Sequence, residues 1–279
     1  MRPRQRFRRA HLSFLRFFVT ETVSAGYYYM VNGTRTRINA DIILNEPHGG
    51  IRFGTDALLL SWAAYDAAAG KKRVLDIGTG SGVIPLLLLG AGSRSHFTGL
   101  EIQPEYASAA NENAAQNGFS ARFTAICGSA GDAAALFPAG GFDVVVTNPP
   151  YMRADCGYVN TSHALSVARR EESGGIAMFC TAAAHCLKSG GKFFAVYRPD
   201  RLSHLLCSMS ENGIEPKKLR FVVPSVGKKP SFVLVQGCRG GREGMVCEPD
   251  LYIYNDPAHS AETKEMLSVY KRFSGERNG

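Results

Sequence analysis

Short apolar runs separated by polar and glycine-rich turns divide most of the chain into alternating strand and helix segments. Buried strands are predicted at 74–77, 96–102, 122–127, 142–147 and 192–197, followed by an antiparallel pair at 219–223 and 232–236. Helices are predicted from 83 onward and over 104–117, 176–187 and 201–211. Because strands that alternate with helices form a mostly parallel sheet, we expect one Rossmann-like α/β domain over 30–275, with seven strands and an antiparallel last strand.

The stretch 1–29 differs in composition, since it mixes six arginines with four phenylalanines. We expect a basic extension that is disordered or, by preference, translated sequence upstream of a true start at Met30. A nucleic-acid-binding arm and a basic targeting or membrane-surface segment are the alternatives. Residues 30–45, with alternating arginine and isoleucine positions, predict a short strand pair before the core.

A glycine-rich turn joins the strand 74–77 to the following helix and predicts a nucleotide cofactor site. Gly78, Gly80 and Gly82 let the backbone turn tightly beside a ligand. A dinucleotide site has the spacing G-x-G-x-x-G, whereas here the third glycine comes one residue earlier and Asp76 closes the strand. This spacing indicates S-adenosylmethionine as the cofactor. A glycine turn in another kind of α/β domain is the alternative.

An acidic residue at the end of the second strand extends this cofactor site. Glu101 and its neighbour Ile102 would lie beside the glycine turn, where a carboxylate can accept hydrogen bonds from both ribose hydroxyls. After the third strand, Ser129 is the candidate for contacting the cofactor adenine, and Asp132 is the alternative.

The segment 50–64 reads as a loop that leads into a helix. Thr55 or Asp56 is expected near the amino-terminal cap of this helix. In an S-adenosylmethionine fold the loop would cover the methionine end of the cofactor, so both residues are also candidate cofactor ligands. Capping alone explains an acidic residue at this position, so helix capping and cofactor binding both remain possible interpretations.

The strand 142–147 delivers the tetrad Asn148-Pro149-Pro150-Tyr151 to the same edge of the sheet. An amino group conjugated to a ring or carbonyl is a poor nucleophile until its nitrogen becomes pyramidal. The side-chain oxygen of Asn148 and the carbonyl of Pro149 can each accept one N–H and stabilise the charge that develops. The prolines restrict the loop, and Tyr151 offers a face for a planar base. We therefore predict amino-group methylation by these four residues. A proline turn after a core strand is the structural alternative.

The seven cysteines contain no C-x-x-C pair, and the seven histidines are scattered. We expect no bound metal, no disulfide framework and a reducing compartment. No apolar run suits a transmembrane helix. The expectation is a cytoplasmic protein without a membrane partner, with a monomer preferred.

The formal net charge of +8 is concentrated in two regions. Residues 1–40 carry eight arginines and one acid, and residues 188–242 carry eleven basic residues and three acids. Basic clusters of this kind are typical of proteins that bind a phosphate backbone, although a solvated surface accounts for many of them.

Several segments together resemble the family of tRNA(Val) adenine-N6 methyltransferases. The resemblance covers residues 45–270 and rests on 51–60, 74–82, Glu101, 148–151, 168–171, 198–202, 215–222 and 249–254. It implies a class I S-adenosylmethionine-dependent methyltransferase fold. It also implies RNA as the partner, most simply tRNA, with the adenine beside the anticodon flipped out of its stack toward Tyr151. The candidate RNA contacts are Tyr151, Arg169, Arg170, Lys217, Lys218 and Arg220.

Other substrates and one non-enzymatic role remain as alternatives. The tetrad suits other RNA bases, such as those of rRNA, and the side-chain amide of a protein glutamine. An RNA-binding module with an inactive cofactor site is the third hypothesis, against which the intact Asp76, Glu101 and Asn148 argue.

Overall fold

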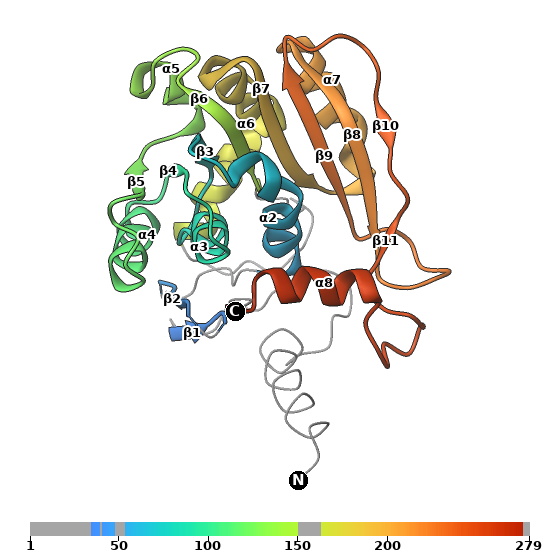
Figure 1. Ribbon diagram of the computed structural model, residues 1–279. Coiled ribbons are helices and arrows are strands. Elements are labelled where there is room, and N and C mark those ends of the chain that lie inside the picture. Colours follow the sequence, from blue (N-terminus) through green and yellow to red (C-terminus); the bar gives the residue numbers. More distant parts are fainter. Residues whose placement is uncertain (1–34, 40, 48–53, 150–162, 276–279) are drawn as a thin grey trace.

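The computed structural model describes residues 35–39, 41–47, 54–149 and 163–275, with the backbone alone at 35–37 and 163–174. The predicted extension 1–29 lies outside these ranges. A nine-stranded sheet lies between two groups of helices (Figure 1). Helices α2 (Thr55–Ala68), α3 (Val83–Gly90) and α4 (Pro104–Gln116) pack on one face, and α6 (His163–Cys186) and α7 (Leu202–Glu211) pack on the other.

The central sheet contains all seven predicted strands in the order β8-β9-β7-β6-β3-β4-β5. Five strands run parallel: β3 (Arg73–Ile77), β4 (His96–Glu101), β5 (Phe123–Cys127), β6 (Phe142–Thr147) and β7 (Leu187–Tyr197). The last predicted strand, β9 (Phe232–Arg239), is antiparallel and lies between β7 and β8 (Ile214–Val223). The predicted mostly parallel fold with an antiparallel last strand is confirmed.

The buried strands explain the two hydrophobic cores. Val144 and Val146 of β6 pack with α2 and α3, whereas Val145 packs with α6. Successive residues of a strand point to opposite faces, so a strand covered on both faces needs apolar residues at nearly every position. The continuous apolar runs in the sequence are therefore the signature of this three-layer arrangement.

Short helical pieces complete the chain between the strands. A 3₁₀ turn, η1 (Ala130–Asp132), and the four-residue helix α5 (Ala133–Leu136) follow β5, and a second 3₁₀ turn, η2 (Pro199–Arg201), precedes α7. Helix α6 is interrupted at Gly175, whose backbone is not helical. The predicted helix start at 176 coincides with this break.

The predicted amino-terminal strand pair is present as β1 (Arg35–Arg37) and β2 (Ile43–Asn45). Asn113 of α4 joins this hairpin to the glycine turn. Its side-chain oxygen accepts the backbone N–H of Asn45, and its amide group donates to the carbonyls of Asn45 and Ser81 at 2.9 and 3.0 Å. Through Asn113, the hairpin thus supports the glycine turn of the predicted cofactor site.

A carboxyl-terminal extension beyond β9 adds two short strands to the seven that were predicted. Two short strands, β10 (Val246–Cys247) and β11 (Leu251–Tyr252), add to β8 in parallel. Helix α8 (Lys264–Arg272) then crosses beside α2, where Thr263 caps its first turn by accepting the N–H of Met266 (Figure 1). Two-residue strands carry no periodicity, so their sequence gives no signal.

Within the described ranges, none of the helices combines the length and the apolar character needed to cross a bilayer. The same residues contain no group of three or more histidine, cysteine or acidic side chains that could hold a metal ion.

Candidate active site

Strand register places three predicted site residues side by side at the carboxyl edge of the sheet. Ile77 of β3 pairs with Leu100 of β4 and with Thr147 of β6. The residues that follow these partners are Gly78, Glu101 and Asn148. Neighbouring strands lie about 4.8 Å apart, so one ligand could contact all three positions.

The glycine turn adopts the conformation that its sequence predicted. Gly78, Gly80 and Gly82 have φ angles of +77°, +55° and +86°, which side-chain-bearing residues rarely adopt. A Cβ atom at Gly82 would lie 2.5 Å from the ring of Phe123, whereas a Cβ at Gly80 would meet no atom of the described residues within 4 Å. Gly82 is therefore required for packing, and Gly80 presents an open stretch of backbone.

Glu101 is held against this turn by backbone hydrogen bonds. Its two carboxylate oxygens accept the N–H of Gly80 at 2.9 Å and the N–H of Gln103 at 3.0 Å. Burial raises the pKa of Glu101 above its ordinary value, although these two N–H groups lower it. Each carboxylate oxygen has a second lone pair, so both can also accept a hydroxyl group. The neighbouring Ile102 is half-buried.

Asp76 is fully buried at the base of the turn. One carboxylate oxygen accepts the hydroxyl of Thr79 at 2.8 Å, and the other has no hydrogen-bond partner among the described residues. Burial raises the pKa of Asp76 to about 7, the Thr79 hydroxyl lowers it, and the charge of Glu101 raises it. A buried acceptor without a partner costs free energy, which a bound cation or donor would recover.

Asn148 is tied to the start of α2 by a side-chain contact that the sequence did not reveal. Its amide nitrogen donates to a carboxylate oxygen of Asp56 at 3.1 Å. The other oxygen of Asp56 accepts the backbone N–H of Ala57 at 2.9 Å, and Asp56 is only 6% exposed. Because a carboxylate only accepts hydrogen bonds, it selects the amide orientation in which Asn148 turns its Nδ2 toward Asp56 and its Oδ1 away.

The start of α2 lies where the sequence predicted it. Gly54 occupies the cap position without a side-chain cap, Thr55 begins the helix half-buried, and Asp56 lies in the first turn. Thr55 and Asp56 therefore lie near the amino-terminal cap as predicted, although neither occupies the cap position itself. One carboxylate oxygen of Asp56 accepts the N–H of Ala57 in the first turn, and the other accepts the side-chain amide of Asn148.

Ser129 has a structural role after β5. It caps η1 by accepting the N–H of Gly131 at 3.1 Å, and Asp132 accepts the N–H of Ser129 at 3.3 Å in a reciprocal capping box. Both candidate adenine ligands are therefore also helix-capping residues. The Ser129 hydroxyl can still donate a hydrogen bond while it caps.

Part of the predicted site lies outside the described residues. Pro149 is buried directly after Asn148, whereas Pro150 and Tyr151 fall in the range 150–162. The backbone of Arg169 and Arg170 belongs to α6, and their side chains lie outside the described part. The roles of these residues stay predictions.

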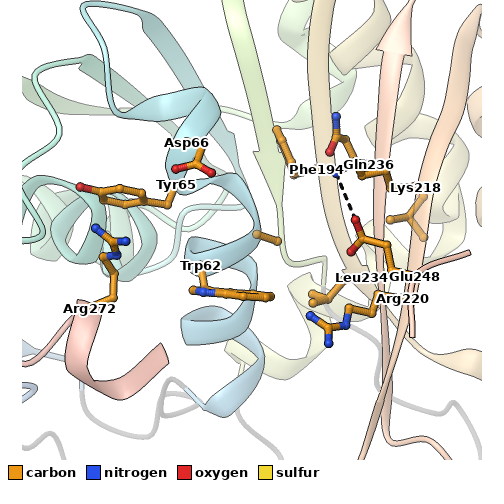
Figure 2. Close-up of a pocket in the computed structure, with 12 residues that line it drawn as sticks. Trp62, Tyr65, Asp66, Phe194, Lys218, Arg220, Leu234, Gln236, Glu248 and Arg272 are labelled. Atoms are coloured by element: carbon orange, nitrogen blue, oxygen red, sulfur yellow. Dashed lines mark ion pairs between the residues drawn. The ribbon is translucent and has the colours of Figure 1, made fainter. Parts of the chain in front are cut away.

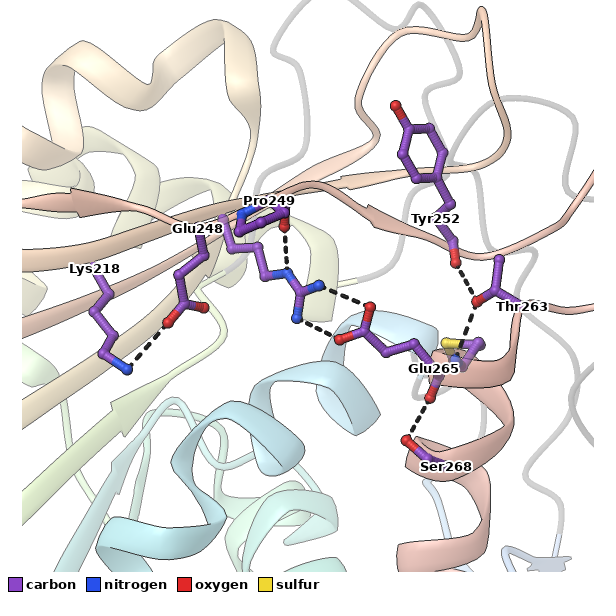
Figure 3. A network of polar contacts seen from close by, with 9 residues as sticks. Lys218, Glu248, Pro249, Tyr252, Thr263, Glu265 and Ser268 are labelled. Carbon is purple, nitrogen blue, oxygen red and sulfur yellow. Dashed lines mark hydrogen bonds and ion pairs between the residues drawn. The ribbon is translucent and has the colours of Figure 1, made fainter.

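The basic residues of β8 are engaged within the protein, as Figure 3 shows for the ion pair of Lys218 with Glu248. Arg220 donates to both carboxylate oxygens of Glu265 at 2.7 and 2.8 Å and to the carbonyl of Pro249. Lys218 pairs with Glu248 at 3.0 Å. Lys217 donates to backbone carbonyls of 242–244. These cations fasten the carboxyl-terminal extension to the sheet, which is a structural role that the RNA prediction did not include.

A pocket of about 230 Å³ lies between α2, the strands β7 to β9 and α8 (Figure 2). Trp62 and Tyr65 of α2 border it, and the guanidinium of Arg220 lies 5.5 Å from the centre of the Trp62 ring. Of the predicted cofactor and catalytic residues that the structure describes, none lines this pocket. The pocket is thus separate from the site at the ends of β3, β4 and β6.

Comparison with known proteins identifies the class of protein to which this fold belongs. A family profile described as "Methyltransferase domain" matches residues 69–239. The solved structure of a predicted O-methyltransferase, Atu636 from Agrobacterium tumefaciens, has the same fold, with a TM-score of 0.64 at 20% identity over 80% of this chain and all of that one. The strand order, the glycine turn and the acid after the second strand define a class I S-adenosylmethionine-dependent methyltransferase.

Similar proteins with known names indicate the family of methyltransferases to which the chain belongs. The tRNA1(Val) (adenine(37)-N6)-methyltransferase of Porphyromonas gingivalis W83 is 33% identical over 188 residues, which cover 66% of this chain and 73% of the relative. The release factor glutamine methyltransferase of Agrobacterium fabrum is 32% identical over 131 residues, 46% of this chain and 44% of the relative. The chain belongs to the family of tRNA1(Val) (adenine(37)-N6)-methyltransferases.

Proposed function

We propose that the protein methylates the exocyclic N6 amine of an adenine in tRNA, and that Asn148 is the residue that activates this amine. The observation that carries the proposal is the position of Asn148 beside the glycine turn, with its amide group oriented by Asp56. The tRNA substrate rests on the family to which the chain belongs.

The described residues fit S-adenosylmethionine on two observations. No atom of the described residues lies within 4 Å of a Cβ built at Gly80, whose N–H is bonded to the Glu101 carboxylate that suits the ribose hydroxyls. The buried oxygen of Asp76 without a partner suits a positively charged or hydrogen-bond-donating part of the cofactor. Thr55 and Asp56 at the start of α2, together with Ile102 and Ser129, remain proposed ligands. When bound, the cofactor supplies an electrophilic methyl group.

The amine of adenine is a weak nucleophile because its lone pair is shared with the ring. The side-chain oxygen of Asn148 and the carbonyl of Pro149 accept its two N–H groups, which favours the pyramidal nitrogen and stabilises the positive charge that develops on it. Tyr151 supplies the face on which the base stacks. None of these steps needs a general base before methyl transfer, because the amine loses its proton only afterwards, when it carries the positive charge and can release the proton to water.

Asp56 has a positioning role in this proposal. If the amide of Asn148 turned by 180°, its NH₂ group would face the substrate amine, and two donors would oppose each other. Acceptance from Nδ2 by the Asp56 carboxylate excludes that orientation. Preorganised acceptors contribute most to catalysis because they need no rearrangement when charge develops.

The test is methyl transfer from labelled S-adenosylmethionine to three substrates isolated from cells that lack this enzyme: total tRNA, total rRNA and protein extract. The expected result is label in N6-methyladenosine from tRNA. Label confined to rRNA, or to glutamine in protein, would keep the chemistry and overturn the proposed substrate.

A further inference from the structure

The loop 224–231, between β8 and β9, lies at the same edge of the sheet as Asn148. Strand β9 is antiparallel to both β7 and β8, so β8 runs parallel to β6 and ends at the edge where Asn148 follows β6. Three strand spacings separate β6 from β8, which corresponds to about 14 Å.

The loop has a defined conformation. The N–H of Lys228 donates to the carbonyl of Ser225 at 3.1 Å, and Gly227 has the φ of +78° that a type II turn requires at its third position. The N–H of Ser231 closes the base of the loop on the carbonyl of Val222 at 2.8 Å. Pro230 restricts the exit of the loop. The side chains on this turn are therefore presented from a fixed backbone.

The carboxyl-terminal extension braces this loop. Directly after β11, the N–H groups of Ile253 and Tyr254 donate to the carbonyls of Val223 and Pro224 at 2.9 and 2.8 Å. The extension itself is anchored by Arg220 through Glu265 and Pro249 (Figure 3). The cations of β8 that are bonded within the protein thus support the loop, and the loop carries a second group of cations.

This second group consists of Lys228 and Lys229, which are both exposed. Within the described part of the chain, neither side chain makes a hydrogen bond or ion pair, in contrast to Lys217, Lys218 and Arg220. Two adjacent ammonium groups on a fixed turn can bind phosphate without first breaking an internal contact.

We propose that Lys228 and Lys229 bind backbone phosphates of nucleotides that flank the methylated adenine. This inference rests on the proposed function, because it requires an RNA substrate at Asn148. Because β8 lies about 14 Å from β6, the lysines that follow β8 meet the RNA backbone to one side of the target base and do not touch the base itself. Contacts of this kind fix the register of the nucleic acid without reading its sequence.

The test compares two double variants that remove the same charge. Lys228→Gln with Lys229→Gln alters the loop, and Lys71→Gln with Lys72→Gln alters an exposed lysine pair directly before β3, at the opposite edge of the sheet. Binding of tRNA is measured as a function of salt, together with S-adenosylmethionine binding and thermal unfolding.

The loop variant should bind tRNA about 10-fold more weakly at low salt. The slope of log affinity against log salt should become shallower by about 1.5, since each phosphate contact contributes about 0.7 to 0.9. The control should bind tRNA like the wild type, and both variants should keep cofactor affinity and thermal stability. Equal losses in the two variants, or no loss in the loop variant, would overturn the inference. A wild type that methylates no RNA would instead overturn the proposed function.

Discussion

The carboxylate of Asp56, at the start of α2, accepts a hydrogen bond from the side-chain amide of Asn148, at the end of β6, at 3.1 Å. The two residues are separated by 92 positions in the sequence. This contact joins the segment expected to cover the cofactor to the tetrad expected to hold the substrate amine. The Asp56 carboxylate therefore contacts both the Asn148 amide and the backbone at the start of α2.

Replacing Asp56 by alanine should reduce the rate of methyl transfer more than the affinity for tRNA. Without the carboxylate, the Asn148 amide can adopt either orientation, so we expect kcat to fall about 10- to 100-fold, which corresponds to about 1.4 to 2.7 kcal/mol. Single-turnover kinetics with saturating tRNA would measure this. Asp66→Ala removes an exposed acid from the same helix and serves as the control. A normal rate in Asp56→Ala would exclude the positioning role.

Asn148→Ala should leave S-adenosylmethionine binding nearly unchanged and lower methyl transfer by about 10²- to 10³-fold, because it removes an acceptor used mainly in the transition state. Calorimetric titration with the cofactor and single-turnover transfer give the two quantities. A parallel loss of cofactor affinity and rate would assign Asn148 to binding instead.

The stability of the cofactor-free protein should fall as pH rises through the range set by Asp76. Its pKa is raised from 3.8 to about 7 on folding. The folded state therefore holds this proton when the unfolded state has already lost it. The stability that the proton provides is complete below pH 3.8 and is lost as pH rises through about 7.

Urea unfolding at pH 5 and pH 8 tests this expectation. Relative to Asp76→Asn, the wild type should lose roughly 3 kcal/mol between the two values, since about two pH units of this interval lie below the folded pKa and each corresponds to about 1.4 kcal/mol. The neutral amide of the variant removes this titration. Parallel pH profiles of the two proteins would contradict the buried, proton-holding state of Asp76.

Arg220→Ala should destabilise the protein. The guanidinium forms a two-pronged pair with Glu265 and lies over Trp62, and its side chain is 12% exposed. Charge-assisted contacts of this kind contribute about 2 kcal/mol, which would lower Tm by about 4 to 8 °C in a domain of this size. Arg220→Lys should recover little of the loss, because a lysine lacks the planar fork. Unchanged unfolding with weakened tRNA binding would restore the RNA role predicted from sequence.

The strands and the cofactor turn could be predicted because their signals are local. The runs at 74–77 and 142–147 are apolar throughout, and the glycines at 78, 80 and 82 occupy left-handed backbone positions that few other residues tolerate. The position of Glu101 at the end of the next strand could also be predicted, because strands and helices alternate at a regular spacing in a parallel sheet.

The other features depend on partners far away in the sequence. From the sequence, Arg220 is expected to be an exposed basic residue on a strand. Its structural role is evident only from the fold, in which α8 places Glu265 against it. The strands β10 and β11 exist because β8 offers an unpaired edge, and nothing in their own two residues indicates pairing. Asp56 was predicted near a helix cap, but only the fold shows that Asn148 ends its strand beside it.

The most direct test of the account is nucleoside analysis of tRNA from cells lacking this enzyme, after incubation with S-adenosylmethionine and either the wild type or Asn148→Ala. N6-methyladenosine should form with the wild type and remain at background with the variant over the same period. Equal amounts with both proteins would contradict the role of Asn148, and no N6-methyladenosine with the wild type would contradict the proposed reaction.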